Sequence, residues 1–199
     1  MTTAIFTLML AATVPPVSDS ITVTATRTET RLADTPASVV VLRREDIEAS
    51  AAATADDMLR QIPGFTLFRR SSSRVANPTT QGVTLRGIGA SGASRALVLE
   101  DGIPLNDPFG GWVYWGRVSK LALQRVEVVR GGGSDLYGSG AMGGVVQFIR
   151  RRDPILSAEL SAGSHSTRNA SAYAVVPHRD WRGAVSIDFF DTAGHILVA

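Results

Sequence analysis

In the first half of the chain, a short apolar run is followed by segments in which apolar residues recur at the spacing of a helix. Val39–Leu42 form a short apolar run of strand type, and the acidic residues within Arg44–Glu48 suit the first turn of a helix. Thr54 fits a helix N-cap with Asp57 three positions on, and a helical pattern follows until Pro63-Gly64 ends it. The apolar positions of that pattern are Met58, Leu59 and Ile62. We therefore predict a strand and short helical segments before residue 65.

Further along, the apolar period changes to two, which is typical of strands. Asp101-Gly102 followed by Ile103–Leu105 is a tight hairpin signal. The strands that we predict are Val83–Arg86, Ala96–Glu100, Val126–Arg130 and Val145–Ile149. Helices and strands together predict an α+β domain: a small mixed sheet with short helices and glycine-rich connections.

The 49 residues after Arg150 predict three antiparallel strands, with turns at Gly163–Ser166 and Pro177–Asp180. In the last of them, Arg182–Asp191, apolar and polar residues alternate as in a membrane β-strand, and a surface hairpin is the alternative. The apolar set is Val185, Ile187 and Phe189, and the polar set is Ser186 and Asp188. A closed barrel needs at least about eight strands. Three strands are therefore too few to close a barrel on their own.

The N-terminal region predicts export. Ala4–Val14 is an apolar run of 11 residues, the length of a signal-peptide core and too short for a spanning helix of about 20 residues. We expect residues 1–20 to be a signal peptide, with a buried N-terminal helix as the alternative. Ile21–Thr26 alternates β-branched residues, which favours an extended segment that can add to a partner's sheet edge or form a disordered leader.

Composition removes several classes of function. The 20 Lys+Arg and 18 Asp+Glu give a formal net charge of +2. This charge is too small for attraction to a phosphate backbone to dominate binding, so we expect no nucleic-acid partner. The absence of cysteine excludes a disulfide scaffold, a thiolate zinc site and a cysteine nucleophile. The histidines stand far apart, at His165, His178 and His195. We expect no enzyme, no catalytic residues, no metal and no cofactor.

Two glycine patterns motivate a competing hypothesis, a dinucleotide-dependent enzyme. Gly87–Gly92 and Gly138–Gly143 both match G-x-G-x-x-G. Each is followed by a predicted strand instead of the helix whose N-terminus would receive a pyrophosphate. The other interpretation is that these glycines permit tight turns and close backbone approach.

Several ordered segments resemble one known family, the plug domain of TonB-dependent outer-membrane receptors. They are Thr35–Val41, Asp57–Phe65, Leu85–Gly89, Val98–Leu105, Arg125–Gly131 and Ser134–Val146. The resemblance covers Ile21 to Arg150, with the plug itself at 31–150. Residues 21–30 resemble the extended segment that carries the TonB box, with Ile21, Thr22, Val23, Thr24 and Ala25 as the residues that contact TonB.

The resemblance implies an outer-membrane transporter for a siderophore, cobalamin, haem or a similar nutrient, driven by the periplasmic energy transducer TonB. In the family, a plug sits inside a barrel of about 22 strands. Arg86 and Arg130 match the family's arginines that face barrel glutamates, and ordinary sheet-face arginines are the alternative. A soluble ligand-binding module with a plug-like fold is the competing function. The resemblance implies that residues 151–199 are the start of an incomplete barrel in a fragment or truncated reading frame, so the chain alone is expected to be unable to transport.

Two loops are candidates for ligand contact. In Asn106–Trp115 the aromatic residues Trp112, Tyr114 and Trp115 are expected either to contact the ligand or to pack against the barrel wall. The second loop, Arg69–Pro78, is polar, and we expect it to be mobile and solvated. Its arginines, among them Arg74, provide the alternative of attracting an anionic substrate.

Overall fold

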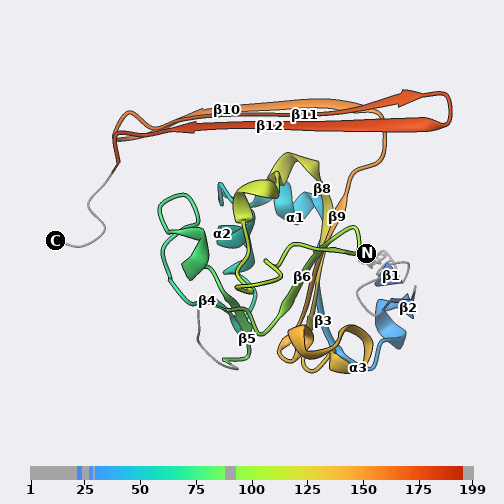
Figure 1. Cartoon of the computed structure of the whole chain (residues 1–199). Coiled ribbons are helices and arrows are strands. Elements are labelled where there is room, and N and C mark those ends of the chain that lie inside the picture. Colours follow the sequence, from blue (N-terminus) through green and yellow to red (C-terminus); the bar gives the residue numbers. More distant parts are fainter. Residues whose placement is uncertain (1–21, 24–26, 29, 88–92, 195–199) are drawn as a thin grey trace, which may run out of the picture.

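The protein is described by a computed structural model over residues 22–23, 27–28, 30–87 and 93–194. Figure 1 shows an α+β domain with three long strands lying as a separate layer along one side. The predicted signal peptide, residues 21, 24–26 and 29 of the box-like segment, residues 88–92 of the first glycine pattern, and residues 195–199 lie outside the described residues. The expected fold class is confirmed.

A five-stranded mixed sheet forms the centre of the domain, in the order β3-β8-β9-β6-β7. Its strands are β3 (Ser38–Leu42), β8 (Leu123–Arg130), β9 (Gly144–Arg150), β6 (Leu97–Glu100) and β7 (Ile103–Pro104). β6 and β9 run parallel, and the other neighbours are antiparallel. The strands predicted around residues 40, 98, 128 and 147 are all present, and Asp101-Gly102 makes the predicted hairpin turn.

Short helices and small strand pairs surround this sheet. The helices are α1 (Arg44–Ala49), α2 (Ala55–Leu59) and α3 (Ser134–Tyr137), and the small pairs are β1 (Thr22–Val23) with β2 (Thr30–Arg31) and β4 (Phe65–Leu67) with β5 (Val83–Leu85). The 3-10 turns are η1 (Leu32–Asp34), η2 (Pro78–Thr80), η3 (Trp115–Arg117), η4 (Lys120–Ala122) and η5 (Ser139–Ala141). Thr54 caps α2 as predicted, since its side chain accepts from the Asp57 N–H.

The hydrophobic core lies between one face of the central sheet and the helices α1 and α2. It contains β8 and β9 side chains such as Val128 and Phe148, which meet Ile47 of α1 and Met58 and Leu59 of α2. All five side chains are fully buried. The apolar residues predicted for this segment therefore do pack in the core, although α2 itself ends at Leu59, before Ile62.

The second glycine pattern leads into a strand. After Gly143 the chain enters β9 directly, so no helix begins where a dinucleotide phosphate would bind. Gly144 has φ +134°, and a Cβ placed there would lie 2.2 Å from the Val129 carbonyl oxygen. The close approach of β8 and β9 requires a glycine at this position.

The C-terminal layer is an antiparallel sheet of three strands in the order β10-β11-β12. Its strands are β10 (Ile155–Ala162), β11 (Arg168–His178) and β12 (Trp181–Asp191). The three predicted strands are present. The second turn is shorter than predicted, because Pro177 and His178 still pair with β12 and only Arg179-Asp180 connects the two strands.

Candidate functional site

The β10–β12 sheet has two chemically different faces. Its register places Leu156, Ala174 and Val185 side by side, and alternation then puts one row of apolar residues on the same face. We call this the outer face. Its large residues are 57% to 83% exposed: Leu156, Leu160, Val176, Trp181, Val185, Ile187 and Phe189. The outer face is thus a continuous apolar surface that the described residues leave uncovered.

The opposite, inner face of this sheet contacts the domain. Tyr173 is buried against Ala122, and its hydroxyl donates to the Arg151 carbonyl oxygen at 2.9 Å. Ser119 Oγ donates to Asp188 Oδ1 at 3.5 Å. The polar residues of this face are Ser157, Glu159, Ser161, Asn169, Ser171, Arg182, Ser186 and Asp188. The predicted alternation in β12 therefore separates a domain-facing side from an apolar side.

Arg74 joins the domain's loop 69–81 to the inner face. Its Nη2 donates to Asn169 Oδ1 at 2.9 Å, and its guanidinium lies 4.1 Å from the centre of the Phe190 ring. Burial lowers the pKa of Arg74 from its usual value, and nearby carboxylates, Asp57 first among them, act in the opposite direction. Arg74 therefore connects the domain to the strands β11 and β12. The sequence indicates only that it lies in a polar loop.

Two further residues of this loop, Ser72 and Ser73, are held by α2, while the mobility expected for the loop as a whole stays a prediction. Ser73 donates from both its hydroxyl and its N–H to the buried carboxylate of Asp56, at 2.5 and 2.9 Å. Ser72 Oγ donates to Asp57 Oδ2 at 2.7 Å. Both carboxylates belong to α2, so charged hydrogen bonds hold residues 72–73 against that helix.

The two predicted plug arginines lie at one corner of the domain, at Pro63-Gly64. Arg130 donates from Nη1 to the Pro63 carbonyl oxygen at 3.2 Å and from Nη2 to Ser38 Oγ at 2.8 Å. Arg86 has φ +59°, and its N–H donates to the Gly64 carbonyl oxygen at 2.8 Å. The Arg86 side chain is exposed. Contact of either arginine with a barrel glutamate stays a prediction.

The aromatic loop divides into a core residue and surface residues. Trp115 is 2% exposed and meets Phe65 and Phe148 edge-on, with 6.3 Å between ring centres in each pair. Its ring therefore belongs to the domain's own core, an outcome that neither sequence-based alternative named. Trp112 and Tyr114 are half-buried and meet edge-on at 6.5 Å. Ligand contact by the three residues stays a prediction.

A cavity of about 280 Å³ lies between loop 69–81 and the segment 113–117. Gln81 forms part of its wall and is only 1% exposed. Within the described residues, neither amide atom of Gln81 has a hydrogen-bond partner, and the same is true of Trp115 Nε1. Gln81 could not be singled out from the sequence, because a lone glutamine carries no signal of burial.

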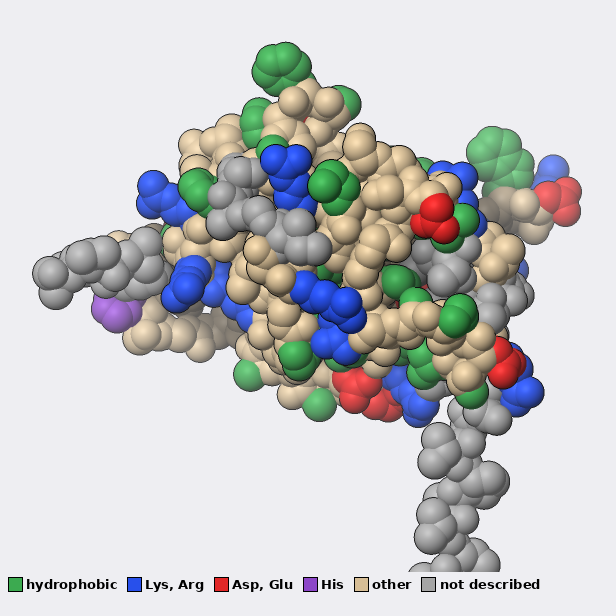
Figure 2. Space-filling view, turned by 90° about the horizontal axis from the view of Figure 1, so that it is seen from below, with side chains coloured by type: hydrophobic (Ala, Val, Ile, Leu, Met, Phe, Trp, Pro, Cys, Tyr) green, Lys and Arg blue, Asp and Glu red, His purple; other side chains and the backbone are tan. Residues whose placement is uncertain are grey.

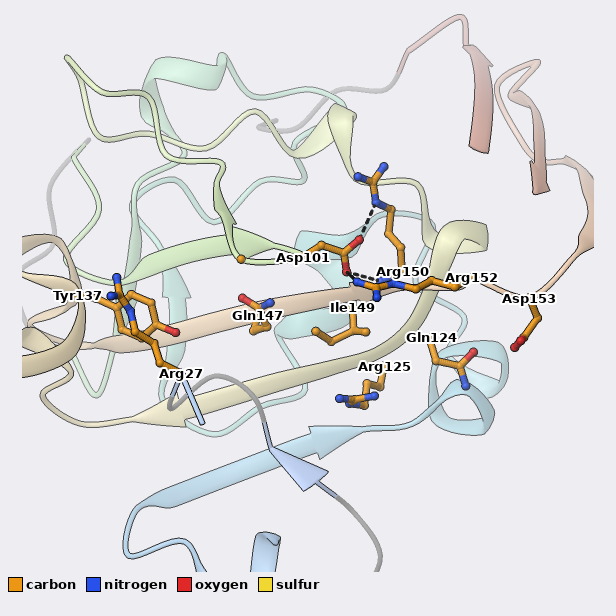
Figure 3. A pocket seen from close by; sticks show the side chains of 11 residues that line it. Arg27, Asp101, Gln124, Arg125, Tyr137, Gln147, Ile149, Arg150, Arg152 and Asp153 are labelled. Carbon is orange, nitrogen blue, oxygen red and sulfur yellow. Dashed lines mark hydrogen bonds and ion pairs between the residues drawn. The ribbon is translucent and has the colours of Figure 1, made fainter. Parts of the chain in front are cut away.

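A larger and more open cavity, about 760 Å³, lies over the central sheet (Figure 3). Arg27 stacks on Tyr137 at one end, 4.5 Å from the ring centre. At the other end, Asp101 accepts from Arg150 at 3.3 Å and pairs with Arg152 at 3.9 Å. The charged side chains of the lining are four arginines, Arg27, Arg125, Arg150 and Arg152, and two aspartates, Asp101 and Asp153. Figure 2 shows, on the side of the domain away from β10–β12, basic side chains spread across the face with acidic ones toward its edge.

Among the described residues, no helix is long and apolar enough to cross a membrane. Within the same residues, no cluster of three or more His, Asp or Glu side chains is placed to hold a metal ion.

An α+β domain held against the inner face of an amphipathic sheet, whose other face is apolar and uncovered, defines a class: a globular domain coupled to membrane β-strands. The family model of the TonB-dependent Receptor Plug Domain matches residues 31–145, more than half of the chain. The chain belongs to this family, as its motifs predicted. Members of the family are outer-membrane proteins.

Individual relatives agree with this assignment. The chain is 33% identical over 147 residues to the vitamin B12 transporter BtuB of Vibrio vulnificus (strain CMCP6), covering 74% of the chain and 22% of that protein. It is 38% identical over 139 residues to the hemin receptor of Yersinia enterocolitica, covering 66% of the chain and 18% of that protein. The chain thus spans about a fifth of the length of these relatives. They are a transporter and a receptor by name, and neither is named as an enzyme.

A solved structure extends the likeness to the fold. The alcaligin outer-membrane receptor FauA of Bordetella pertussis is similar with a TM-score of 0.64 and 23% identity, covering 85% of the chain and 29% of that receptor. At this identity the comparison supports the fold alone.

Proposed function

We propose that the chain is the plug and the opening strands of a TonB-dependent outer-membrane receptor that imports a small nutrient such as a siderophore, cobalamin or haem. One observation carries the proposal: the inner face of β10–β12 contacts the plug through Tyr173 and Asp188, while the outer face is an uncovered apolar row. Such a sheet fits a plug on one side and lipid on the other. The names of the vitamin B12 and hemin relatives support the substrate class.

The dimensions of the outer face support a membrane location. Trp181 and Phe189 lie at opposite ends of the apolar row, eight residues apart in β12, which is about 27 Å along a strand. At the usual strand tilt of about 40°, this length spans about 20 Å along the membrane normal, which fits within the apolar band of outer-membrane strands, about 25 Å tall and bordered by aromatic residues. The soluble-module alternative would leave this whole row exposed to water, which counts against it.

The arrangement of the turns supports an orientation. The connection at Arg179-Asp180 is shorter than the connection between β10 and β11, and outer-membrane barrels have short periplasmic turns. In Figure 1, β1 and β2 lie toward the end of the sheet where β11 turns into β12. The described part of the box-like segment, Thr22–Val23, would then face the periplasm, where TonB acts.

For the box we propose strand addition: Ile21, Thr22, Val23, Thr24 and Ala25 pair with the sheet edge of TonB. Thr22 and Val23 already adopt strand conformation and pair with Thr30 and Arg31. Backbone pairing of this kind gives affinity through main-chain hydrogen bonds. TonB would therefore exchange places with β2 as the partner of this segment.

A titration of the whole chain with the TonB C-terminal domain tests this proposal. We expect saturable binding to the unaltered chain and loss of binding in Val23→Pro, because proline removes the N–H that the ladder needs. Val23→Thr is the matched control, since it keeps both the β-branch and the N–H. No binding to the unaltered chain, or equal binding by Val23→Pro, would refute the assignment of the box.

A further inference from the structure

The cavity between loop 69–81 and segment 113–117 carries an unused set of hydrogen-bonding groups. Its wall is formed mainly by Ser73, Pro78, Gln81, Tyr114, Trp115 and Arg117. Gln81 Oε1, Gln81 Nε2 and Trp115 Nε1 are all buried and have no partner among the described residues. Buried polar groups are nearly always hydrogen-bonded, so three such atoms at one cavity require an explanation.

Of the other polar side chains of the wall, Ser73 is engaged by a hydrogen bond, and Arg117 is exposed and stacks on Tyr114. Ser73 Oγ donates to Asp56 Oδ1 at 2.5 Å, and the Arg117 guanidinium lies over the Tyr114 ring, 5.0 Å from its centre. The buried groups of the wall that have no partner among the described residues are therefore the donors Gln81 NH2 and Trp115 indole N–H and the acceptor Gln81 carbonyl. Small-molecule binding sites are commonly apolar cavities in which a small number of polar groups fix the orientation of the ligand.

We infer that this cavity binds a neutral ligand group in which a carbonyl adjoins an N–H, a primary carboxamide or a lactam. The ligand amide and the Gln81 amide exchange two hydrogen bonds, and the second lone pair of the ligand carbonyl accepts from Trp115 Nε1. The amide atoms of Gln81 are shielded from solvent, so ligand binding requires the Gln81 side chain to turn toward the cavity. A carboxylate or a ketone lacks the N–H and leaves Gln81 Oε1 without a donor.

The cavity volume fixes the size of the probe. A volume of about 280 Å³ is the liquid share of about nine water molecules. Benzamide has a comparable number of non-hydrogen atoms and carries the required carbonyl and N–H on a planar ring. The inference goes beyond the proposed function, because it names a ligand chemistry and is measured in the absence of TonB. Failure of the TonB titration therefore leaves this result unchanged, and the reverse also holds.

The experiment is a ligand-observed NMR titration of the whole chain in detergent micelles with benzamide, benzoate and acetophenone. We expect benzamide to bind with a Kd on the order of 1 mM. Benzoate and acetophenone should bind at least about tenfold more weakly, since each leaves a buried acceptor unpaired. Absence of saturable benzamide binding, the result that a cavity holding only water would give, overturns the inference. Benzoate binding as tight as benzamide binding overturns it as well.

Variants locate the binding to this cavity. Gln81→Leu should weaken benzamide binding at least about tenfold and raise Tm, because two unpartnered buried atoms are replaced by methyl groups. Gln61→Leu is the matched control: the same substitution at an exposed glutamine, which should leave binding unchanged. Equal benzamide binding by the unaltered chain and a folded Gln81→Leu overturns the inference. The three-probe series on the unaltered chain decides the matter even where the variant does not fold.

Discussion

Arg130 donates a hydrogen bond from Nη1 to the carbonyl oxygen of Pro63 at 3.2 Å, although 67 residues separate them in the sequence. The same guanidinium reaches Ser38 Oγ at 2.8 Å, so one side chain at the end of β8 joins the first strand of the sheet to the turn after α2. Arg130→Ala should lower the free energy of unfolding by about 1–2 kcal/mol, because two charge-assisted hydrogen bonds are lost.

Chemical denaturation measures this change. Arg152→Ala is the control, since the Arg152 side chain is 71% exposed and its ion pair with Asp101 is long, 3.9 Å. The control should change stability by less than about 0.5 kcal/mol. Equal effects of the two substitutions would show that the Arg130 contacts contribute nothing to the fold.

Arg86 adopts a backbone conformation that favours glycine, with φ +59°. Arg86→Gly should therefore stabilise the chain relative to Arg86→Ala by about 1 kcal/mol, because both variants lack the side chain and only glycine relieves the strain. The comparison of the two Tm values separates the backbone effect from any role of the guanidinium. A glycine variant less stable than the alanine variant would contradict the left-handed conformation.

Gly144 marks the closest approach of two neighbouring strands. A Cβ there would lie 2.2 Å from the Val129 carbonyl oxygen, a backbone atom that cannot turn away, and φ is +134°. Gly144→Ala should cost about 3 kcal/mol or more. Gly132→Ala, where nothing lies within 4 Å of the added carbon, should change stability by less than about 0.5 kcal/mol. Tm values that fall equally in the two variants would refute this packing.

Glu100 makes stability depend on pH. Burial raises the pKa of Glu100 above its usual value of 4.5, while Arg150, 3.7 Å away, partly opposes the rise. Between 4.5 and the raised pKa the folded chain holds a proton that the unfolded chain has lost, so stability falls as pH increases through that window. In Glu100→Gln this fall should be absent. Unfolding curves recorded from pH 4 upward should therefore diverge, and superimposable pH profiles would contradict the raised pKa.

The sequence predicted the elements whose signal is local. The apolar runs of β3, β6, β8 and β9 and the alternation in β12 depend only on neighbouring residues, and all five strands are present. Thr54 also acts as the predicted cap of α2. Of the pair β4–β5, only β5 was predicted. Phe65–Leu67 is too short to show a periodic pattern, and it forms a strand through its pairing with β5.

The candidate site could be predicted only in part. Trp115 sits in a loop by sequence, yet Phe65 and Phe148, which come from distant elements, enclose its ring. The anchoring of Ser73 by Asp56 depends in the same way on a contact between loop and helix. Gln81 is buried by segments on both sides of it, and nothing in its neighbourhood distinguishes it from an exposed glutamine. In all three cases, contacts between residues far apart in the sequence determine the environment of the side chain. The local pattern of apolar and polar residues carries no information on such contacts.

The most direct test of the account is the accessibility of adjacent positions in β12. The chain has no cysteine, so Ile187→Cys and Asp188→Cys each give a single site for a spin label. In detergent micelles, collisions with oxygen and with a water-soluble nickel complex report lipid-like and aqueous surroundings. We predict that the label at 187 meets oxygen preferentially, while the label at 188, on the plug-facing side, meets the water-soluble nickel complex preferentially. Labels with the same oxygen and nickel accessibility would contradict a sheet with one face toward the plug and the other toward the membrane.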